Sequence, residues 1–451
     1  MKPTRRELVA GVSALALAPG CIKGGGDSLD TAVPLGPAPA RTPEPEMLWE
    51  PLRVVDEAMF PSGVQVGDVT ATEGFVSVWS SQPSATIRLA VAEAGEWLPL
   101  PGEWEVIFVD GSAQIMVDGL EADTAYCVFA DSPDGRSTVS RFRTALGVDG
   151  WRVLTIGATS CLRRNQPWRS MSQVASGRPD MFFFLGDTVY ADGAQTLEEY
   201  RAYWRTARTT GGFRDVSQAT SLVATWDDHE VMNDFEGLAA PAERVLAAKT
   251  AFREAIPQRR GPDGSSIWRR LSWGATADVF VLDSRGERDG EAQYLSIEQM
   301  DWLKRELSGS TARFKVILNS VPITDYTDIF GAVLIADRWG GYPDQRTELL
   351  AHIEAEGVGG VLWITGDFHF CCASRVDPPG GMAENQWEVM VGPGGSTPNI
   401  AGQLLDPTEQ FPVVFAEWSS SQITLDPGNG TAHVEWVSDD GEVLGEITLN
   451  L

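Results

Sequence analysis

The pattern of apolar and polar positions changes near residue 150. From about Phe60 to Ala145, apolar residues alternate with polar ones in six or seven short runs, and Gly, Pro, Asp and Ser separate the runs. Alternation with a period of two is typical of strands that bury one face, and many short strands joined by turns favour a small β-sandwich. We therefore expect a β-sandwich domain over residues 49–147.

From Trp151 onward, longer apolar runs are followed by segments with the apolar spacing of a helix, which predicts an α/β domain over residues 148–451. The expected strands are 153–160, 180–187, 221–228, 278–284, 314–320 and 361–367, and the expected helices are 196–208, 241–256, 296–307 and 344–356. Each strand ends at or just before a polar residue, at the position where such folds place ligand sites. These residues are Cys161, Asp187, Asp228, Asp283, Asn319 and Asp367.

The chain is strongly acidic, with 63 Asp and Glu against 35 Lys and Arg and a formal net charge of −28. This balance argues against nucleic acid, or an anionic membrane surface, as the main partner. It fits the solvated acidic faces of an exported protein, and it also fits a protein that holds cations.

Residues 1–21 have the features of an export signal. Arg5 and Arg6 precede an apolar run that is too short to span a bilayer, which resembles a twin-arginine signal. LALAPGC then resembles a lipobox with Cys21 as the lipidated residue, and the alternative is a soluble exported protein cleaved nearby. Residues 22–48 are rich in Gly and then in Pro, which predicts an extended linker.

Three strand ends carry candidate chemistry together. The segments are LGDTVY at 185–190, WDDHE at 226–230 and TGDFH at 365–369. In extended geometry Asp367 and His369 share one face of the chain and can point into one pocket. Carboxylates that face one another repel, so a cluster of several cations explains this grouping better than three unrelated acidic turns.

These motifs, in order, resemble the PhoD-like (alkaline phosphatase and phosphodiesterase D) branch of the metallophosphatases. The matching segments are ATSC at 158–161, LGDTVYADG at 185–193, WDDHEVMND at 226–234, LDSR at 282–285, EQMDWL at 298–303, DRWGGYPDQR at 337–346 and TGDFH at 365–369. The resemblance covers nearly the whole chain. It implies an α/β sandwich of two sheets flanked by helices, with bound Fe³⁺ and Ca²⁺.

The ligands that the resemblance implies are Cys161, Asp187, Tyr190, Asp228, Asp367 and His369. Asp187 would bridge the metals, while Cys161 and Tyr190 would bind iron. Thiolate and tyrosinate are strong anionic donors suited to trivalent iron, whereas carboxylates suit calcium.

His229 follows the expected ligand Asp228 and would act on the substrate, either as a general acid or by stabilising charge on the transferring phosphoryl group. Asp227 and Glu230 would turn away from the metals to orient the loop or tune the imidazole. The alternative is that this acidic run only caps the helix that follows.

Candidates for contact with the substrate are Arg285, Trp339 and Tyr342, with Arg163 and Arg164 as further cations near a phosphate. An arginine near a strand end is as often a structural ion-pair partner. The two aromatic residues either wall the entrance of the site or pack in the interior.

Two smaller expectations concern the sandwich and the cysteines. GLEADTAYCVF at 119–129 resembles the corner of fibronectin type III-like domains, with Tyr126 at the corner and Cys127 buried and free on the opposite face. A bridge between Cys161 and Cys371 is conceivable because Cys371 shares the strand face of His369. We nevertheless expect Cys161 to be free, since metal loading before export would commit it as a ligand.

The sequence thus predicts an exported, metal-dependent phosphoric ester hydrolase, a monoesterase or a diesterase, that uses a metal-activated hydroxide. Small phosphate esters are the expected substrates, a monomer is the expected state, and the expected location is periplasmic or extracellular, with a lipid anchor if Cys21 is modified. The alternatives are a phosphodiesterase with little monoesterase activity and a non-catalytic surface lipoprotein whose calcium stiffens a scaffold. The thiol at position 161 favours an enzyme, because scaffold calcium needs oxygen donors only.

Overall fold

The structure is a computed structural model that describes residues 38–163, 167–290, 293–326 and 337–451. The expected signal at 1–21, with Cys21, and the expected linker up to residue 37 lie outside the described residues. No helix in the described part of the chain is both long enough and apolar enough to cross a membrane. All described residues belong to one unit.

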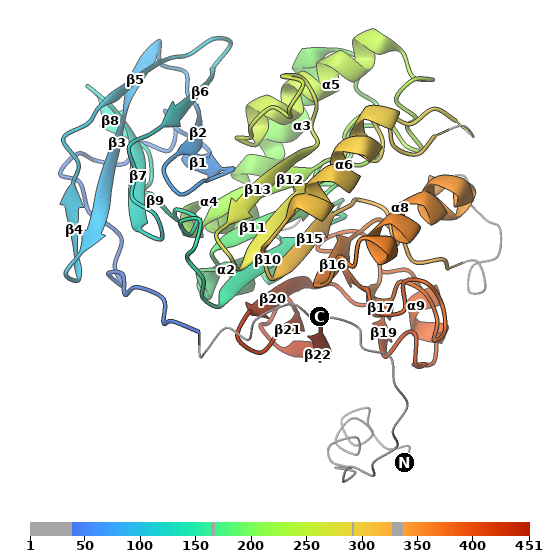
Figure 1. The fold of residues 1–451 in the computed structure, drawn as a ribbon. Helices are drawn as coiled ribbons and strands as arrows, with labels where there is room; N and C mark the ends of the chain where they lie inside the picture. The colour runs from blue at the N-terminus through green and yellow to red at the C-terminus, as the bar shows by residue number, and fades with distance from the viewer. Residues whose placement is uncertain (1–37, 164–166, 291–292, 327–336) are drawn as a thin grey trace, which may run out of the picture. The chain divides into compact units, whose positions relative to one another are not determined.

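The N-terminal part is the β-sandwich that the alternation predicts (Figure 1). One of its sheets contains β1, β2 and β6; the other has the order β4-β3-β7-β8, with β5 paired to β3 and β9 paired to β7. The strands are β1 Val64–Gly67, β2 Gly74–Trp79, β3 Ser84–Glu93, β4 Glu96–Pro99, β5 Trp104–Ile107, β6 Ser112–Val117, β7 Ala125–Ser132, β8 Gly135–Arg136 and β9 Ser140–Arg143.

Tyr126 closes a corner of this sandwich. The backbone N–H of Glu121 donates to its hydroxyl at 2.8 Å, and its ring stacks on Phe142 with the ring centroids 5.5 Å apart. A hydroxyl bonded to backbone a few residues upstream is the mark of a tyrosine corner, so the prediction for Tyr126 is confirmed. Cys127 is buried and free as expected, and burial raises the pKa of its thiol to about 12.

The first sheet of the α/β part has nine strands in the order β22-β21-β20-β10-β11-β12-β1-β2-β6. Its strands outside the sandwich are β10 Leu154–Thr159, β11 Met181–Leu185, β12 Ser221–Thr225, β20 Ser420–Asp426, β21 Thr431–Val437 and β22 Val443–Asn450. Strands β1 and β12 run parallel with Gly67 opposite Leu222, so the sheet continues across the expected boundary between residues 147 and 148. Gly67 has no room for a side chain, because a Cβ there would lie 2.1 Å from the carbonyl oxygen of Pro257.

The second sheet has seven strands in the order β13-β14-β15-β16-β18-β17-β19, of which β14, β15, β16 and β18 are parallel. The strands are β13 Arg269–Trp273, β14 Ala277–Val281, β15 Phe314–Leu318, β16 Val361–Thr365, β17 Cys371–Arg375, β18 Trp387–Val391 and β19 Val413–Phe415. The helices are α2 Arg169–Ser176, α3 Leu197–Thr209, α4 Gly211–Ala219, α5 Ala242–Ala255, α6 Ile297–Gly309, α8 Pro343–Ala355 and α9 Ala401–Leu404, with the 3₁₀ helix η2 at Trp339–Gly341.

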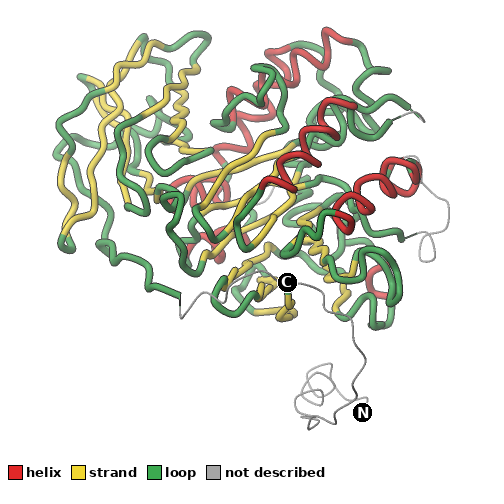
Figure 2. Tube along the Cα trace, in the orientation of Figure 1, coloured by secondary structure: helices red, strands yellow, loops and turns green. Residues whose placement is uncertain are grey.

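The two sheets pack face to face and the helices lie outside them, as Figure 2 shows. Phe183 and Leu185 of β11 face Val316 and Leu318 of β15 across the common core. On the outer faces, α2 to α5 cover the nine-stranded sheet and α6 and α8 cover the seven-stranded sheet. This two-sheet α/β sandwich with flanking helices confirms the predicted fold class, and all six predicted strands and four predicted helices are present within a few residues of their expected bounds.

Candidate metal centre

The predicted ligands come from the carboxyl ends of four strands, β10, β11, β12 and β16, which meet at one edge of the two sheets. Four of these residues adopt left-handed backbone conformations that side chains disfavour. They are Cys161 (φ 57°), Asp187 (φ 55°), Asp367 (φ 66°) and His369 (φ 57°). Each residue held in such a conformation typically destabilises the folded state by about 1–3 kcal/mol, and backbone strain of this kind is typical of functional sites.

The loop after β11 is held in place by its neighbours. Gly186 is required there, because a Cβ would lie 2.4 Å from the Cβ of Asp227. The carboxylate of Glu230 accepts the backbone N–H groups of Asp187, Thr188, Val189 and Asp227 at 2.6 to 3.2 Å. The prediction that Glu230 orients the loop is therefore confirmed.

Asp187 shares a first group of potential ligand atoms with Cys161 and His369, and these atoms lie within 4.8 Å of one another. The hydroxyl of Tyr190 lies 2.9 Å from Oδ2 of Asp187 and 3.3 Å from Nε2 of His369, so Tyr190 joins this group. Nδ1 of His369 lies 3.2 Å from the carbonyl oxygen of Thr397. That bond orients Nε2 toward the group, where it can bind a cation as in many histidine ligands. Burial lowers the pKa of His369 to about 4, which keeps the imidazole neutral.

Asp187 also belongs to a second group, made of oxygen atoms only. Its other members are Asp227, Asp228 and Asp367, and their ligand atoms again lie within 4.8 Å of one another. Asp227 was expected to turn away from the metals, and this is wrong. Its carboxylate points into the group because Gly186 lets it pack against the β11 loop, and it accepts bonds from Arg285 and from Ser320 at 3.0 Å.

The electrostatics of these groups favour cations. Burial raises the pKa of Asp187 well above its usual range, and repulsion from Asp228 and Asp227 adds to this effect. Burial, Asp187 and other acids likewise raise the pKa of the Cys161 thiol. Oδ1 of Asp187 and Oδ2 of Asp227 are buried and have no hydrogen-bond partner among the described residues. Buried acceptors that lack partners are costly, and a cation would satisfy both, so the donor set fits bound cations.

His229 shares a third group of potential ligand atoms with Asp187 and Asp228, within 4.8 Å of one another, and it also has a hydrogen-bond partner outside that group. Its Nδ1 lies 2.7 Å from Oδ1 of Asp192, and its ring centroid lies 4.0 Å from that of Tyr190. With Nδ1 held by a carboxylate, Nε2 is the atom available for proton transfer. Asp192 lies in the LGDTVYADG segment but was not among the predicted site residues. Ser396, whose Oγ lies 2.7 Å from the Tyr190 hydroxyl, had no sequence signal.

The predicted substrate contacts lie elsewhere than expected. Arg285 is fully buried and pairs with Asp227 and Asp337, so it is an ion-pair partner of the acids and not a surface contact for substrate. Trp339 and Tyr342 are buried in the core under α6 and α8, where both rings pack on Tyr294 with centroids 4.3 and 5.2 Å away.

Arg163 is the exposed cation of the site. Its guanidinium carbon lies 5.4 Å from the ring centroid of Tyr190. Arg164 lies outside the described residues.

No cysteine of the described chain is in a disulfide, so the prediction that Cys161 is free is confirmed. Cys371 also lies apart from the two ligand groups. Its Sγ lies 3.1 Å from Oγ of Ser419, and burial raises the pKa of its thiol to about 12. Cys161 thus remains available as a ligand.

The fold and the site define a protein of the metallophosphatase class. The chain belongs to the PhoD-like phosphatase family, whose model matches residues 156–424. It is 27% identical to alkaline phosphatase D of Bacillus subtilis (strain 168) in an alignment of 320 residues that covers 59% of this chain and 54% of the relative. The chain therefore aligns with about half the length of this curated relative.

Two solved structures share the fold. The structure of PhoD superposes with a TM-score of 0.75 at 20% identity, covering 87% of this chain and 89% of that chain. Purple acid phosphatase PPD1 from seeds of yellow lupin (Lupinus luteus) superposes with a TM-score of 0.62 at 12% identity, covering 86% and 74%. At these identities the likeness extends to the fold alone.

Proposed function

We propose that this protein hydrolyses phosphoric esters at a centre of at least two cations. The observation that carries the proposal is the position of Asp187, which belongs to one group containing a thiol and an imidazole and to another containing only carboxylates. One carboxylate shared by two dissimilar donor sets is suited to bridging two different metals. The proposal also fits the family to which the chain belongs.

The metals we propose are Fe³⁺ in the first group and Ca²⁺ in the second. Cys161, Tyr190 and His369 would hold the iron, because thiolate, phenolate and neutral imidazole suit a trivalent transition metal. Asp228 and Asp367 would hold calcium through oxygen atoms. When bound, the metals would polarise the phosphoryl group and supply the hydroxide nucleophile.

The residues of the chain have separate tasks in this proposal. His229 gives a proton to the leaving oxygen through Nε2, and Asp192 holds the ring in the orientation that this requires. Arg163 is the exposed cation beside the centre and contacts a phosphate oxygen of the substrate. Arg285 holds Asp227 and Asp337 in place without touching the substrate.

Metal analysis combined with a substrate panel tests this function. The panel pairs monoesters and diesters that share one leaving group, so that the rate ratio reports only the second ester oxygen. We expect iron and calcium in the purified protein, and turnover of at least one ester type that falls to background in Asp187→Ala. A scaffold lipoprotein would instead contain calcium without iron and would turn over neither ester.

We further propose that the protein is exported and acts as a monomer on small phosphate esters. The export part of this proposal rests on the paired arginines at positions 5 and 6 and on the apolar run that follows them. Cell fractionation of the parent and of the Arg5→Lys/Arg6→Lys variant tests export. A membrane-bound fraction that is lost in Cys21→Ser would establish the lipid anchor.

A further inference from the structure

A cavity of about 510 Å³ lies beside the C-terminal end of α5, away from the metal-centre residues. Three arginines line it, Arg253, Arg259 and Arg260, together with Phe75, Met116 and two glutamines, and no carboxylate is among its lining residues. Such a wall is unexpected in a chain with a formal net charge of −28. We call this hollow the arginine cavity.

The charges of the arginine cavity are only partly balanced. Arg259 pairs with Glu73 at 2.8 Å, and its guanidinium carbon lies 5.3 Å from the ring centroid of Phe75. Arg253 and Arg260 have no carboxylate within ion-pair distance among the described residues. Arg253 instead donates to the carbonyl oxygen of Ser266, and Arg260 donates to that of Gly264 at 3.3 Å.

A second observation comes from Arg253 itself. Its Nε is buried and has no hydrogen-bond partner in the described part of the chain. Burial lowers the pKa of Arg253, and repulsion from Arg260 and Arg269 lowers it further. A buried donor without a partner, next to a like charge, is unfavourable unless an anion completes the arrangement.

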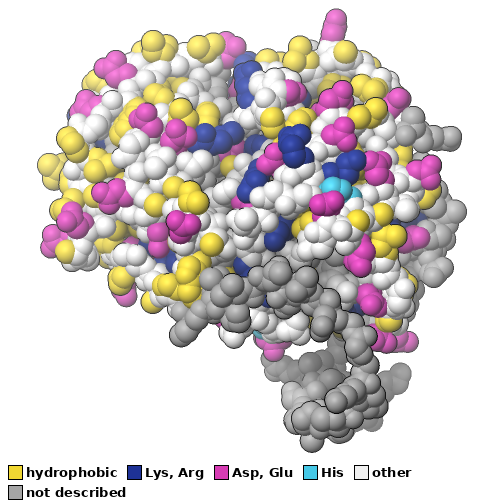
Figure 3. Space-filling model, viewed as in Figure 1, with side chains coloured by type: hydrophobic (Ala, Val, Ile, Leu, Met, Phe, Trp, Pro, Cys, Tyr) yellow, Lys and Arg dark blue, Asp and Glu magenta, His cyan; other side chains and the backbone are white. Residues whose placement is uncertain are grey.

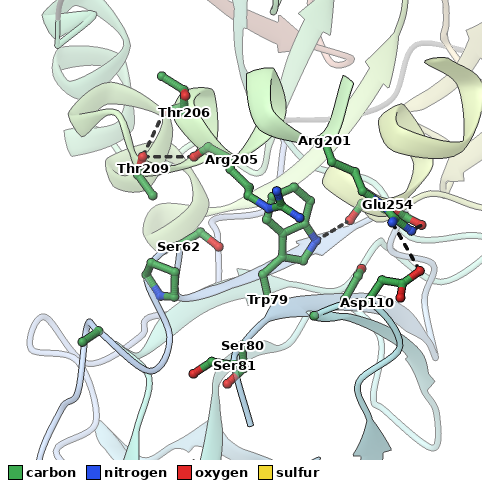
Figure 4. Close-up of a pocket in the computed structure, with 14 residues that line it drawn as sticks. Ser62, Trp79, Ser80, Ser81, Asp110, Arg201, Arg205, Thr206, Thr209 and Glu254 are labelled. Atoms are coloured by element: carbon green, nitrogen blue, oxygen red, sulfur yellow. Dashed lines mark hydrogen bonds and ion pairs between the residues drawn. The ribbon is translucent and has the colours of Figure 1, made fainter. Parts of the chain in front are cut away.

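A second cavity of about 490 Å³, between the β-sandwich and α3, provides an internal comparison. It is also lined by arginine, but Arg201 there pairs with Glu254 at 2.7 Å and with Asp110 at 3.3 Å (Figure 4). Balanced pairs of this kind leave no demand for a ligand. Figure 3 shows Lys and Arg side chains over the middle of this face of the molecule, while Asp and Glu are spread over both sides.

We propose that the arginine cavity binds a small oxyanion with two or more negative charges, of the phosphate or diphosphate class. Planar guanidinium groups match the geometry of phosphate oxygens and donate to them in pairs. Phe75 and Met116 provide an apolar wall that also accommodates the organic part of a phosphorylated compound. The inference does not depend on hydrolysis at the metal centre.

Calorimetric titration with methylenediphosphonate tests the site, because the P–C–P bond of this probe resists hydrolysis. This titration uses the Asp187→Ala protein, in which the proposed metals cannot compete for the probe. A second titration adds inorganic sulfate to the metal-loaded parent. In both titrations we expect saturable binding with one site per chain. Binding should weaken as salt rises, since the attraction is largely electrostatic.

Arg260→Ala is the main variant, because Arg260 is exposed and its loss does not threaten folding. In Arg260→Ala we expect the affinity for the oxyanion to fall at least about tenfold, which corresponds to about 1.4 kcal/mol. In the double variant Arg253→Gln/Arg260→Ala we expect no binding. The matched control is Arg305→Ala, which removes the same charge from an exposed position on α6, where Glu306 is the only ion-pair partner among the described residues. Unchanged affinity in Arg260→Ala, or no saturable binding to either protein at low salt, would overturn the proposal.

Discussion

Replacement of Arg285 tests whether this residue stabilises the fold or contacts the substrate. The guanidinium donates through Nε to Asp227 and through its terminal nitrogens to Asp337, with Nη2 and Oδ2 of Asp337 at 3.1 Å. In Arg285→Gln both carboxylates lose this partner, and Asp227 is only 1% exposed. Removing one member of a buried ion pair typically costs about 3–5 kcal/mol. We expect a value near the lower limit, because Asp337 keeps Arg288 at 3.1 Å.

Urea unfolding of metal-loaded protein measures this loss, with the midpoint reporting stability and the slope reporting the surface exposed. Arg163→Gln is the comparison, since Arg163 is exposed above Tyr190. Surface substitutions of this kind usually change stability by less than about 0.5 kcal/mol, so this variant should raise KM and leave the midpoint unchanged. Arg285→Gln with the parent's midpoint and a raised KM would show that Arg285 contacts substrate after all.

Three further outcomes follow from the metal centre. His229→Ala should keep both metals and lose turnover by about 10²- to 10⁴-fold, with a smaller loss for esters of good leaving groups; an equal rate on a poor leaving group would exclude the acid role. Asp187→Ala should lose both metals together, as measured by elemental analysis, because one carboxylate serves both groups. Cys161→Ser should lose iron and the colour that thiolate and phenolate ligands give it, whereas Cys371→Ser should keep both; an active, colourless, iron-free parent would refute the iron assignment.

The strands and helices that carry the site were predictable because their apolar runs are long and fully buried. The predicted strand 180–187 ends two residues early, at Leu185, since Gly186 and Asp187 leave the extended conformation with φ of 91° and 55°. The strands β20 and β21 were not predicted, although their burial alternates along the chain and the signal was available. The pairing of β20 with β10 connects residues more than 250 positions apart, which no local pattern reveals.

Within the site, the positions of several side chains could not be predicted from the sequence because tertiary contacts determine them. Trp339 and Tyr342 lie in the DRWGGYPDQR segment and were expected either to wall the entrance or to pack in the interior, and their contacts with Tyr294 place them in the core. Alternation along a strand would send Asp227 and Asp228 to opposite sides, yet the chain turns after β12, where the backbone carbonyl oxygen of Asp228 accepts the N–H of Val231 at 2.8 Å. Both carboxylates then reach the same group of ligand atoms.

Backbone strain and charge repulsion are concentrated at the same sheet edge, and both have to be offset there. Asp187 combines a left-handed backbone, a buried carboxylate and three acidic neighbours in its ligand group. The four N–H groups that donate to Glu230 hold the loop in shape, but they add no positive charge against the carboxylates. Bound cations would supply that charge, and binding that favours only the folded loop would add its free energy to the stability of the loop. Under the proposed function, metal binding and the ordering of the β11 loop would therefore be linked, and Asp187 would contribute to the local fold as well as to the chemistry.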